Sequence, residues 1–224
     1  ATFNVGEDNT HITTSDAAGN TVALTGAVAL GAGVTIDTDN TTNDGAVTIT
    51  GTVDSADATD RAFTITAGTA DVSVTGAIGA TNDLATLTVT GNDISLANIG
   101  GGSSGVTGAT SVTATDGADT ALLTLSGTTY NTAGTQAYTG GTLGISLSAG
   151  APVTFTTTAD NVTFTGTVTL ANGSDLTVTT AGSAPGSGNI SFGDIRGTSS
   201  EDVTLNAASA NVTVGAIGNA DEIN

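Results

Sequence analysis

The chain contains no cysteine, no methionine, no tryptophan and no lysine, and it has few prolines and aromatic residues. Without cysteine there is neither a disulfide framework nor a thiolate for catalysis or metal binding. No apolar run approaches the roughly 20 residues of a membrane-spanning helix, and no basic segment leads into an apolar one as in a signal peptide. We therefore expect no direct insertion into a membrane.

Positive charge is almost absent. The basic groups are Arg61, Arg196 and the titratable His11, whereas Asp and Glu total 21, which gives a formal net charge of −19. A nucleic-acid partner needs clustered cations for its phosphates, so this class of partner is excluded. Docking on anionic lipid is disfavoured for the same reason. Such a charge keeps the chain soluble and makes copies repel one another, so divalent cations or salt are expected to influence assembly.

The residues that are present favour β-structure. Apolar residues make up 38 % of the chain, and most of them stand two positions apart with Thr, Ser or Ala between them. This spacing is typical of strands and not of helices. β-Branched residues suit a pleated, half-buried surface. We expect short strands and turns almost throughout.

One pattern recurs along the whole chain: an apolar pair, a glycine and a second apolar pair. It reads TVALTGAVAL at Thr21–Leu30 and NVTFTGTVTL at Asn161–Leu170. Glycine permits a sharp bend between two strands. The apolar residues that open the units are Val22, Val47, Val72, Ile94, Leu123, Ile145, Val162, Ile190 and Val212.

Repetition at this spacing is the signature of a solenoid. Further apolar pairs lie between the units, so each period holds three short strands, as in one coil of a parallel β-helix. The sequence therefore predicts a single all-β solenoid domain over residues 1–224 with about nine coils. A β-sandwich whose units are joined by donor strands is the alternative.

Two longer features interrupt this regularity. Residues 13–84 match residues 156–223, which indicates an internal duplication. The segment 98–142 fits the pattern least well and holds both tyrosines, Tyr130 and Tyr138. These tyrosines predict either a wider coil with an aromatic filling or a local binding surface.

Three strings carry a resemblance to a family: ITTSDAAGNTVALTGAVALGAGVTIDTDN (12–40), TTYNTAGTQAYTGG (128–141) and ADNVTFTGTVTLANGSDLTV (159–178). They resemble repetitive bacterial surface proteins related to filamentous haemagglutinin and autotransporter passengers, and the last also resembles the beta strand repeats of giant adhesins. The resemblance implies a right-handed parallel β-helix exported to the cell surface as a stalk, adhesin or fibre. The lack of lysine departs from the family.

An acidic turn is the candidate metal site. Calcium takes several oxygen ligands from carboxylates and carbonyls, and the string DTDNTTNDG offers Asp37, Asp39, Asn40, Asn43 and Asp44. Further acidic clusters are Asp54/Asp57/Asp60, Asp116/Asp119, Glu201/Asp202 and Asp221/Glu222. No EF-hand loop is complete, because the closing glutamate is missing. Solvated turns, in which Asp and Asn favour Asx geometry, are the alternative.

Catalytic signals are weak. His11 has no cysteine or second histidine to share a metal or a triad, so we expect no enzyme. The composition and the resemblance together predict an extracellular structural protein, a subunit of a bacterial surface fibre, sheath, layer or adhesin that assembles head to tail with copies of itself. One alternative is a stalk that does not polymerise and binds surface glycans or cells.

A second alternative is an ice-binding protein. It rests on the repeated Thr-x-Thr, which occurs at Thr48/Thr50, Thr64/Thr66, Thr86/Thr88/Thr90, Thr113/Thr115 and Thr177/Thr179. Stacked outward threonines would form a flat, regular array.

Overall fold

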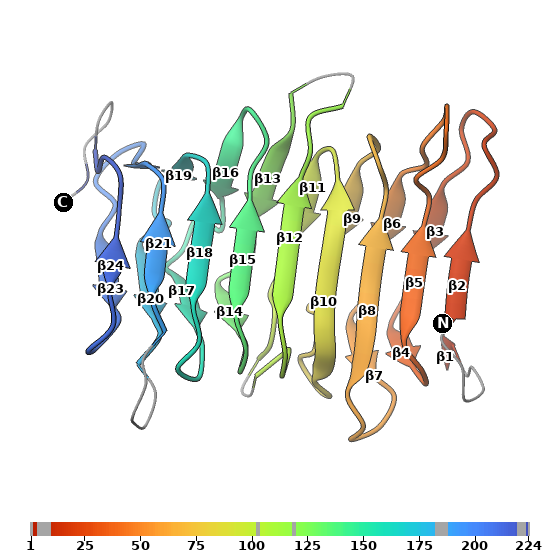
Figure 1. The fold of residues 1–224 in the computed structure, drawn as a ribbon, viewed down its shortest axis with the longest axis horizontal. Coiled ribbons are helices and arrows are strands. Elements are labelled where there is room, and N and C mark those ends of the chain that lie inside the picture. Colours follow the sequence, from red (N-terminus) through yellow and green to blue (C-terminus); the bar gives the residue numbers. More distant parts are fainter. Residues whose placement is uncertain are drawn as a thin grey trace.

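The computed structural model describes residues 2–3, 10–101, 104–117, 120–181, 188–218 and 223. Every regular element among them is a β-strand. All pairings between these strands are parallel, and the chain winds as a β-solenoid of about eight turns (Figure 1). The predicted all-β parallel solenoid is thereby confirmed over the β-sandwich. The right-handed winding of the solenoid stays a prediction. It is the handedness that nearly all crossovers between parallel strands have.

Three faces make up each coil. The nine-stranded face, here sheet B, comprises β2 (Thr10–Thr13), β5 (Val34–Asp37), β8 (Arg61–Thr66), β10 (Leu84–Gly91), β12 (Thr110–Ala114), β15 (Gln136–Thr139), β18 (Val162–Thr165), β21 (Ile190–Phe192) and β24 (Val212–Thr213). The eight-stranded face, sheet C, comprises β3 (Val22–Leu24), β6 (Val47–Ile49), β9 (Val72–Val74), β11 (Ile94–Leu96), β13 (Leu122–Leu125), β16 (Gly144–Leu147), β19 (Val168–Leu170) and β22 (Ile195–Arg196).

The third face, sheet A, has two parts. One part comprises β1 (Thr2–Phe3), β4 (Val28–Leu30) and β7 (Val53–Ser55), and the other β14 (Thr129–Asn131), β17 (Val153–Thr156), β20 (Leu176–Thr179) and β23 (Val203–Asn206). Single bridges through Ile78 and Ile99 connect the two parts, from Val53 to Tyr130. Sheet A is therefore continuous along the axis, but in the middle of the chain its pairing is reduced to single bridges.

The apolar spacing of two accounts for the core. In most strands the first apolar residue and the one two positions later are buried, and the residue between them faces outward. Register then places like on like, as where Ile36 pairs with Ile65 and Val47 with Val72. Because side chains alternate with a period of two, a slip by one residue would turn every outward Thr inward.

The coil count is lower than expected, with about eight full turns where the sequence suggested nine. The units that open at Val22 to Ile145 all lie in sheet C, whereas those that open at Val162, Ile190 and Val212 lie in sheet B. The residues that open the repeated unit therefore lie on one face in the first part of the chain and on another face in the last part. The next strands of sheet C begin at Val168 and Ile195 instead.

The same change of face affects the long repeat. Val22 of sheet C matches Val162 of sheet B, and Phe63 of sheet B matches Val203 of sheet A. The two copies therefore share a pattern but are rotated by one face. Their bends use the same device, since Gly26 has φ 87° between sheets C and A and Gly166 has φ 105° between sheets B and C. Positive φ is a conformation that glycine adopts at little cost.

Both tyrosines are fully buried. The Tyr130 ring stacks on Phe155 with centroids 4.6 Å apart, and Tyr138 stacks on Phe164 at 5.2 Å. The Tyr138 hydroxyl donates to Gln136 Oε1 over 3.0 Å, and burial raises the pKa of both phenols. The aromatic filling expected for residues 98–142 is present, and neither tyrosine is available to a binding surface.

We predict that Gly51→Ala lowers the free energy of unfolding by about 1–3 kcal/mol, the usual cost of overpacking. A Cβ at Gly51 would overlap the backbone of Gly26 in the coil below, and Gly76 stands in the same way on Gly51. Urea unfolding followed by circular dichroism measures the change. Gly101→Ala is the matched control, because its nearest neighbour would be Ala80 O at 3.3 Å. Equal stability of the two variants would contradict the close backbone contact between Gly51 and Gly26.

Candidate functional site

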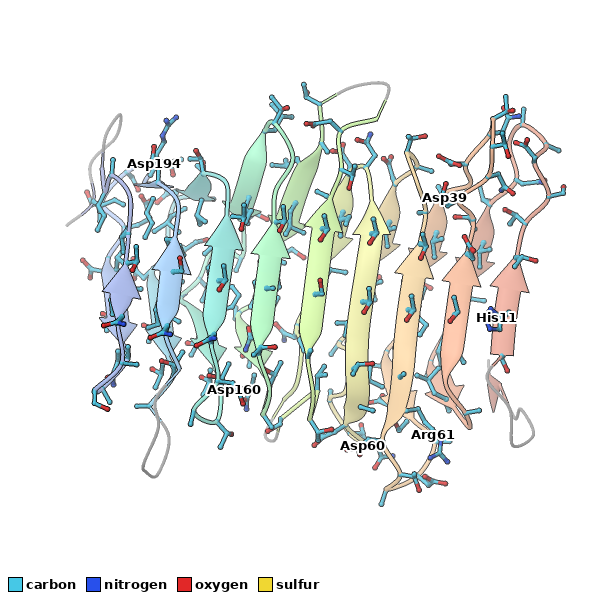
Figure 2. The ribbon with its side chains drawn as sticks, viewed as in Figure 1. His11, Asp39, Asp60, Arg61, Asp160 and Asp194 are labelled. Carbon is cyan, nitrogen blue, oxygen red and sulfur yellow. The ribbon has the colours of Figure 1, made fainter. Side chains whose placement is uncertain are left out.

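The five residues predicted to bind calcium lie at one corner of the solenoid. Asp37 ends β5, and the other four lie in the loop that leads from β5 to β6. Figure 2 shows Asp39 in this loop, at the edge of the sheet. Strand β5 and strand β6 belong to different faces, so the loop must turn the chain and satisfy its own backbone N–H groups.

Asp44 is the most engaged of the five. Its Oδ1 accepts the N–H of Asn40 at 2.7 Å, and its Oδ2 accepts the N–H and the hydroxyl of Thr69, both at 2.6 Å. Thr69 belongs to the next coil. The hydroxyl and N–H of Thr69 hold the pKa of Asp44 below its usual value. Gly68, at φ 56°, lies against the carboxylates of both Asp44 and Asp39.

The remaining residues face other partners. Asn43 donates its N–H to Asp16 Oδ1 in the preceding coil over 2.7 Å, which lowers the pKa of Asp16. Asp37 accepts the N–H of Asp39 within its own turn at 3.1 Å. The structure therefore brings Asp37, Asp39, Asn40 and Asp44 into one turn and directs Asn43 toward Asp16 of the preceding coil.

No group of three or more His, Cys, Asp or Glu side chains in the described residues is arranged to hold a metal ion. The carboxylates of the loop are instead acceptors for backbone N–H groups. Calcium at this corner stays a prediction.

The same use of acidic side chains extends along the rod. Asp71 Oδ1 accepts the N–H of Asp93 at 3.3 Å, and Asp93 Oδ1 accepts the N–H of Leu122 at 2.8 Å. In each hydrogen bond of this kind that is named here, the Asp or Asn acceptor lies in the earlier coil and the donor in the later one. The other acceptors are Asp16, Asp44, Asp54, Asn98, Asp116, Asn161, Asp175, Asn189 and Asp194.

This inter-coil role was missed in the sequence, although a signal was present. Several of these acceptors stand immediately before the first buried residue of a strand and recur at that position in the next coil. Asn161, Asn189 and Asn211 form such a column, with bonds of 2.7 and 3.0 Å between successive members. The members of such a column are one coil apart in the chain, so they do not appear as a cluster when Asp and Asn residues are considered turn by turn.

Two other acidic clusters also serve turns. Asp116 accepts the N–H of Ala121 at 2.7 Å and both the hydroxyl and the N–H of Thr142 in the next coil; these bonds, the hydroxyl above all, lower its pKa. Asp54 and Asp57 accept backbone N–H groups of Thr81 and Thr59. Asp119, Asp221 and Glu222 lie outside the described residues.

Glu201 is a buried carboxylate. Burial alone would raise its pKa, but the Ser199 hydroxyl and the N–H groups of Ser199 and Thr198 outweigh this and lower the pKa to about 2. The two N–H donors lie 2.9 and 2.8 Å from Oε2. Glu201 therefore closes a turn as an anion that remains charged through most of the acid range.

The cations are as sparse in space as in sequence. Arg61 Nη2 lies 3.6 Å from Asp57 Oδ1, and Arg61 Nε donates to Gly31 O at 3.0 Å. Arg196 makes no ion pair with any described residue. His11 lies on β2, one of the two edge strands of sheet B (Figure 2). The described part of the chain thus places no cationic cluster on any face.

A shallow depression of about 290 Å³ lies over sheet C. Its polar lining consists of Asp71, Ser73, Asp93, Ser95 and Thr124, beside Leu122. Both carboxylates already accept inter-coil N–H groups through one oxygen. The lining offers hydroxyls and carboxylates but no histidine, lysine or arginine as a partner base or acid.

The geometry defines the protein as an acidic parallel β-solenoid. Comparison with protein-family models, with curated proteins and with solved structures gives no match. Among the described residues there is no helix of the length and apolarity that crossing a membrane requires.

We predict that Glu201→Gln reduces the loss of stability on acidification. The lowered folded pKa means that Glu201 contributes stability above its unfolded value of 4.5, and that this contribution is lost as the pH falls toward about 2. Urea midpoints measured across this range in native protein and variant isolate the contribution by difference. Ser199→Ala, which keeps the carboxylate and the backbone donors, is expected to lie between them. Identical acid limbs for native protein and Glu201→Gln would refute this role.

Proposed function

We propose that the chain is a rigid structural segment of an extracellular bacterial surface fibre, sheath, layer or adhesin, and that its copies stack head to tail. The observation that carries the proposal is the unbroken parallel stacking of coils along the axis, which a further coil would continue at the last described one. Val212 is 45 % and Ile217 51 % exposed. Their partners one coil earlier, Ile190 and Ile195, are fully buried.

A further coil would bury this edge. Burial of apolar surface contributes roughly 25 cal/mol per Å², and an exposed strand edge is a template for pairing. At the opposite end, Ile12 of β2 and Leu24 of β3 are half-buried and face the same way into the core. A second copy that joins its first coil to this last one continues both sheets, and such a heterologous contact generates open fibres.

The ladders between coils support the proposed mechanical role. Backbone hydrogen bonds between coils run along the axis in all three faces, as in Val22 N to Ala46 O and Val47 N to Asp71 O, both at 2.9 Å. Axial extension must break many of these bonds together. The side-chain acceptors at the corners add bonds in the same direction.

The charge sets the conditions of assembly. A net charge of −19 opposes the approach of a second copy, so cations are needed to screen or bridge the ends. Calcium at acidic corners such as Asp39–Asp44 is one way to meet this need and belongs to the proposal. A stalk that remains monomeric and binds surface glycans is the alternative, which the depression over sheet C favours through its hydroxyl and carboxylate lining.

We predict that the purified chain forms filaments in electron micrographs and that Val212→Glu with Ile217→Glu abolishes them. The two glutamates place charge where the next coil must pack. Leu143→Glu is the matched control, because Leu143 is 56 % exposed on the flank and not at the edge. Short, isolated rods for the native chain with and without calcium would overturn head-to-tail assembly and favour the stalk. Loss of the filaments when calcium is chelated would indicate that a bound cation bridges neighbouring copies.

A further inference from the structure

The outer face of sheet B carries two straight rows of side chains. Strand register defines the first row as His11, Thr35, Thr64, Thr88, Ser111, Ala137, Thr163, Ser191 and Thr213. The second row is Thr13, Asp37, Thr66, Thr90, Thr113, Thr139 and Thr165. Only some of these threonines stand out as Thr-x-Thr pairs in the sequence, because the rows are assembled across coils.

The rows form a regular two-dimensional lattice. Members of a row are about 4.8 Å apart, the distance between adjacent strands, and the two rows are about 6.6 Å apart, the rise of two residues. Sheet B runs without interruption through nine strands, and these strands lie nearly parallel to one another in Figure 1. Threonine is stiff at χ1, so its methyl and hydroxyl groups are held in place before any ligand binds.

This lattice is free of charge over most of its length. From β8 onward the first row as far as β21 and the second row as far as β18 hold no ionisable residue, although the chain carries a net charge of −19. Figure 2 shows Asp39, Asp60, Asp160 and Asp194 in the turns that border the sheet. The acidic groups thus frame a neutral face.

The other faces lack this arrangement. Outward positions of sheet C form one row, Ala23, Thr48, Ser73, Ser95, Thr124, Ser146, Thr169 and Arg196. Sheet A has Asp54 outward, and its paired threonines, such as Thr154 and Thr156, extend over β17 and β20 alone. The general preference of strands for Thr applies to every outer face, so it does not account for the concentration on sheet B.

We propose that the outer face of sheet B binds ice. Ordered water is the ligand that matches a neutral lattice of hydroxyl and methyl groups with spacings of the order of those between water molecules in ice. Water held by such hydroxyls is nearly as favourable as a direct hydrogen bond. A second copy would bring its own acidic turns against those that frame this face, and crystalline polysaccharides need aromatic platforms, which neither row contains. The proposal does not depend on head-to-tail assembly.

The test is thermal hysteresis and ice-recrystallisation inhibition by the purified chain, compared with Thr88→Lys and Thr124→Lys. Thr88 lies at the centre of the first row between Thr64 and Ser111, and Thr124 is its counterpart on sheet C between Ser95 and Ser146. Both variants add the same charge. We expect activity in the native chain, its loss in Thr88→Lys and its retention in Thr124→Lys, with unchanged circular dichroism in both.

A gain of activity provides the second arm. Ala137→Thr fills a gap in the first row between Ser111 and Thr163 and is expected to increase thermal hysteresis. A purely structural role for the face would leave hysteresis unmoved. Absence of activity in the native chain, or equal loss in Thr88→Lys and Thr124→Lys, overturns the proposal. Pull-down of the native chain by cellulose or chitin, without hysteresis, assigns the face to a polysaccharide instead.

Discussion

In-register stacking of parallel coils is the constraint on which the rest of this structure depends. Each inward side chain lies on its equivalent in the coils before and after it, so Ile36 packs over Ile65 and Phe164 stacks on Phe192 with ring centroids 4.4 Å apart. The core is a single stack of side chains enclosed by backbone. A side chain that does not fit in one coil therefore disturbs the packing of the coils on both sides. Glycine columns at the corners follow from the same stacking, because the backbone of Gly51 lies directly on that of Gly26.

The acidity of the chain has a structural explanation in these corners. Backbone ladders satisfy the N–H groups of the strands but leave some at the turns, and buried or half-buried donors need partners. Asp and Asn side chains of the preceding coil supply them, as Asp93 does for Leu122 and Asn161 for Asn189. Lysine and arginine have no acceptor oxygen, so the same positions select against cations. The net charge is then a by-product of turn chemistry as well as a determinant of solubility.

The sequence was sufficient for the fold and insufficient for the sites. Apolar spacing of two identified the strands, and the glycine bends identified the coil, because both depend on neighbours in the chain. The change of face at Val162 escaped detection, since the pattern around it is the same as that around Val22. The acceptor role of Asp44 toward Thr69 and the rows on sheet B depend on residues one coil apart. Coil lengths vary, so this register becomes visible only when the strands are paired in space.

The rotation between the two copies of the long repeat has a consequence for how such a rod can change in length. A strand–glycine–strand unit that turns the corner after sheet C in one copy turns the corner after sheet B in the other. The same unit thus serves at two different corners, so an insertion or deletion need not comprise a whole coil and can be one strand with its bend. A rod lengthened by one such strand and its bend would carry each following stretch of sequence on a different face.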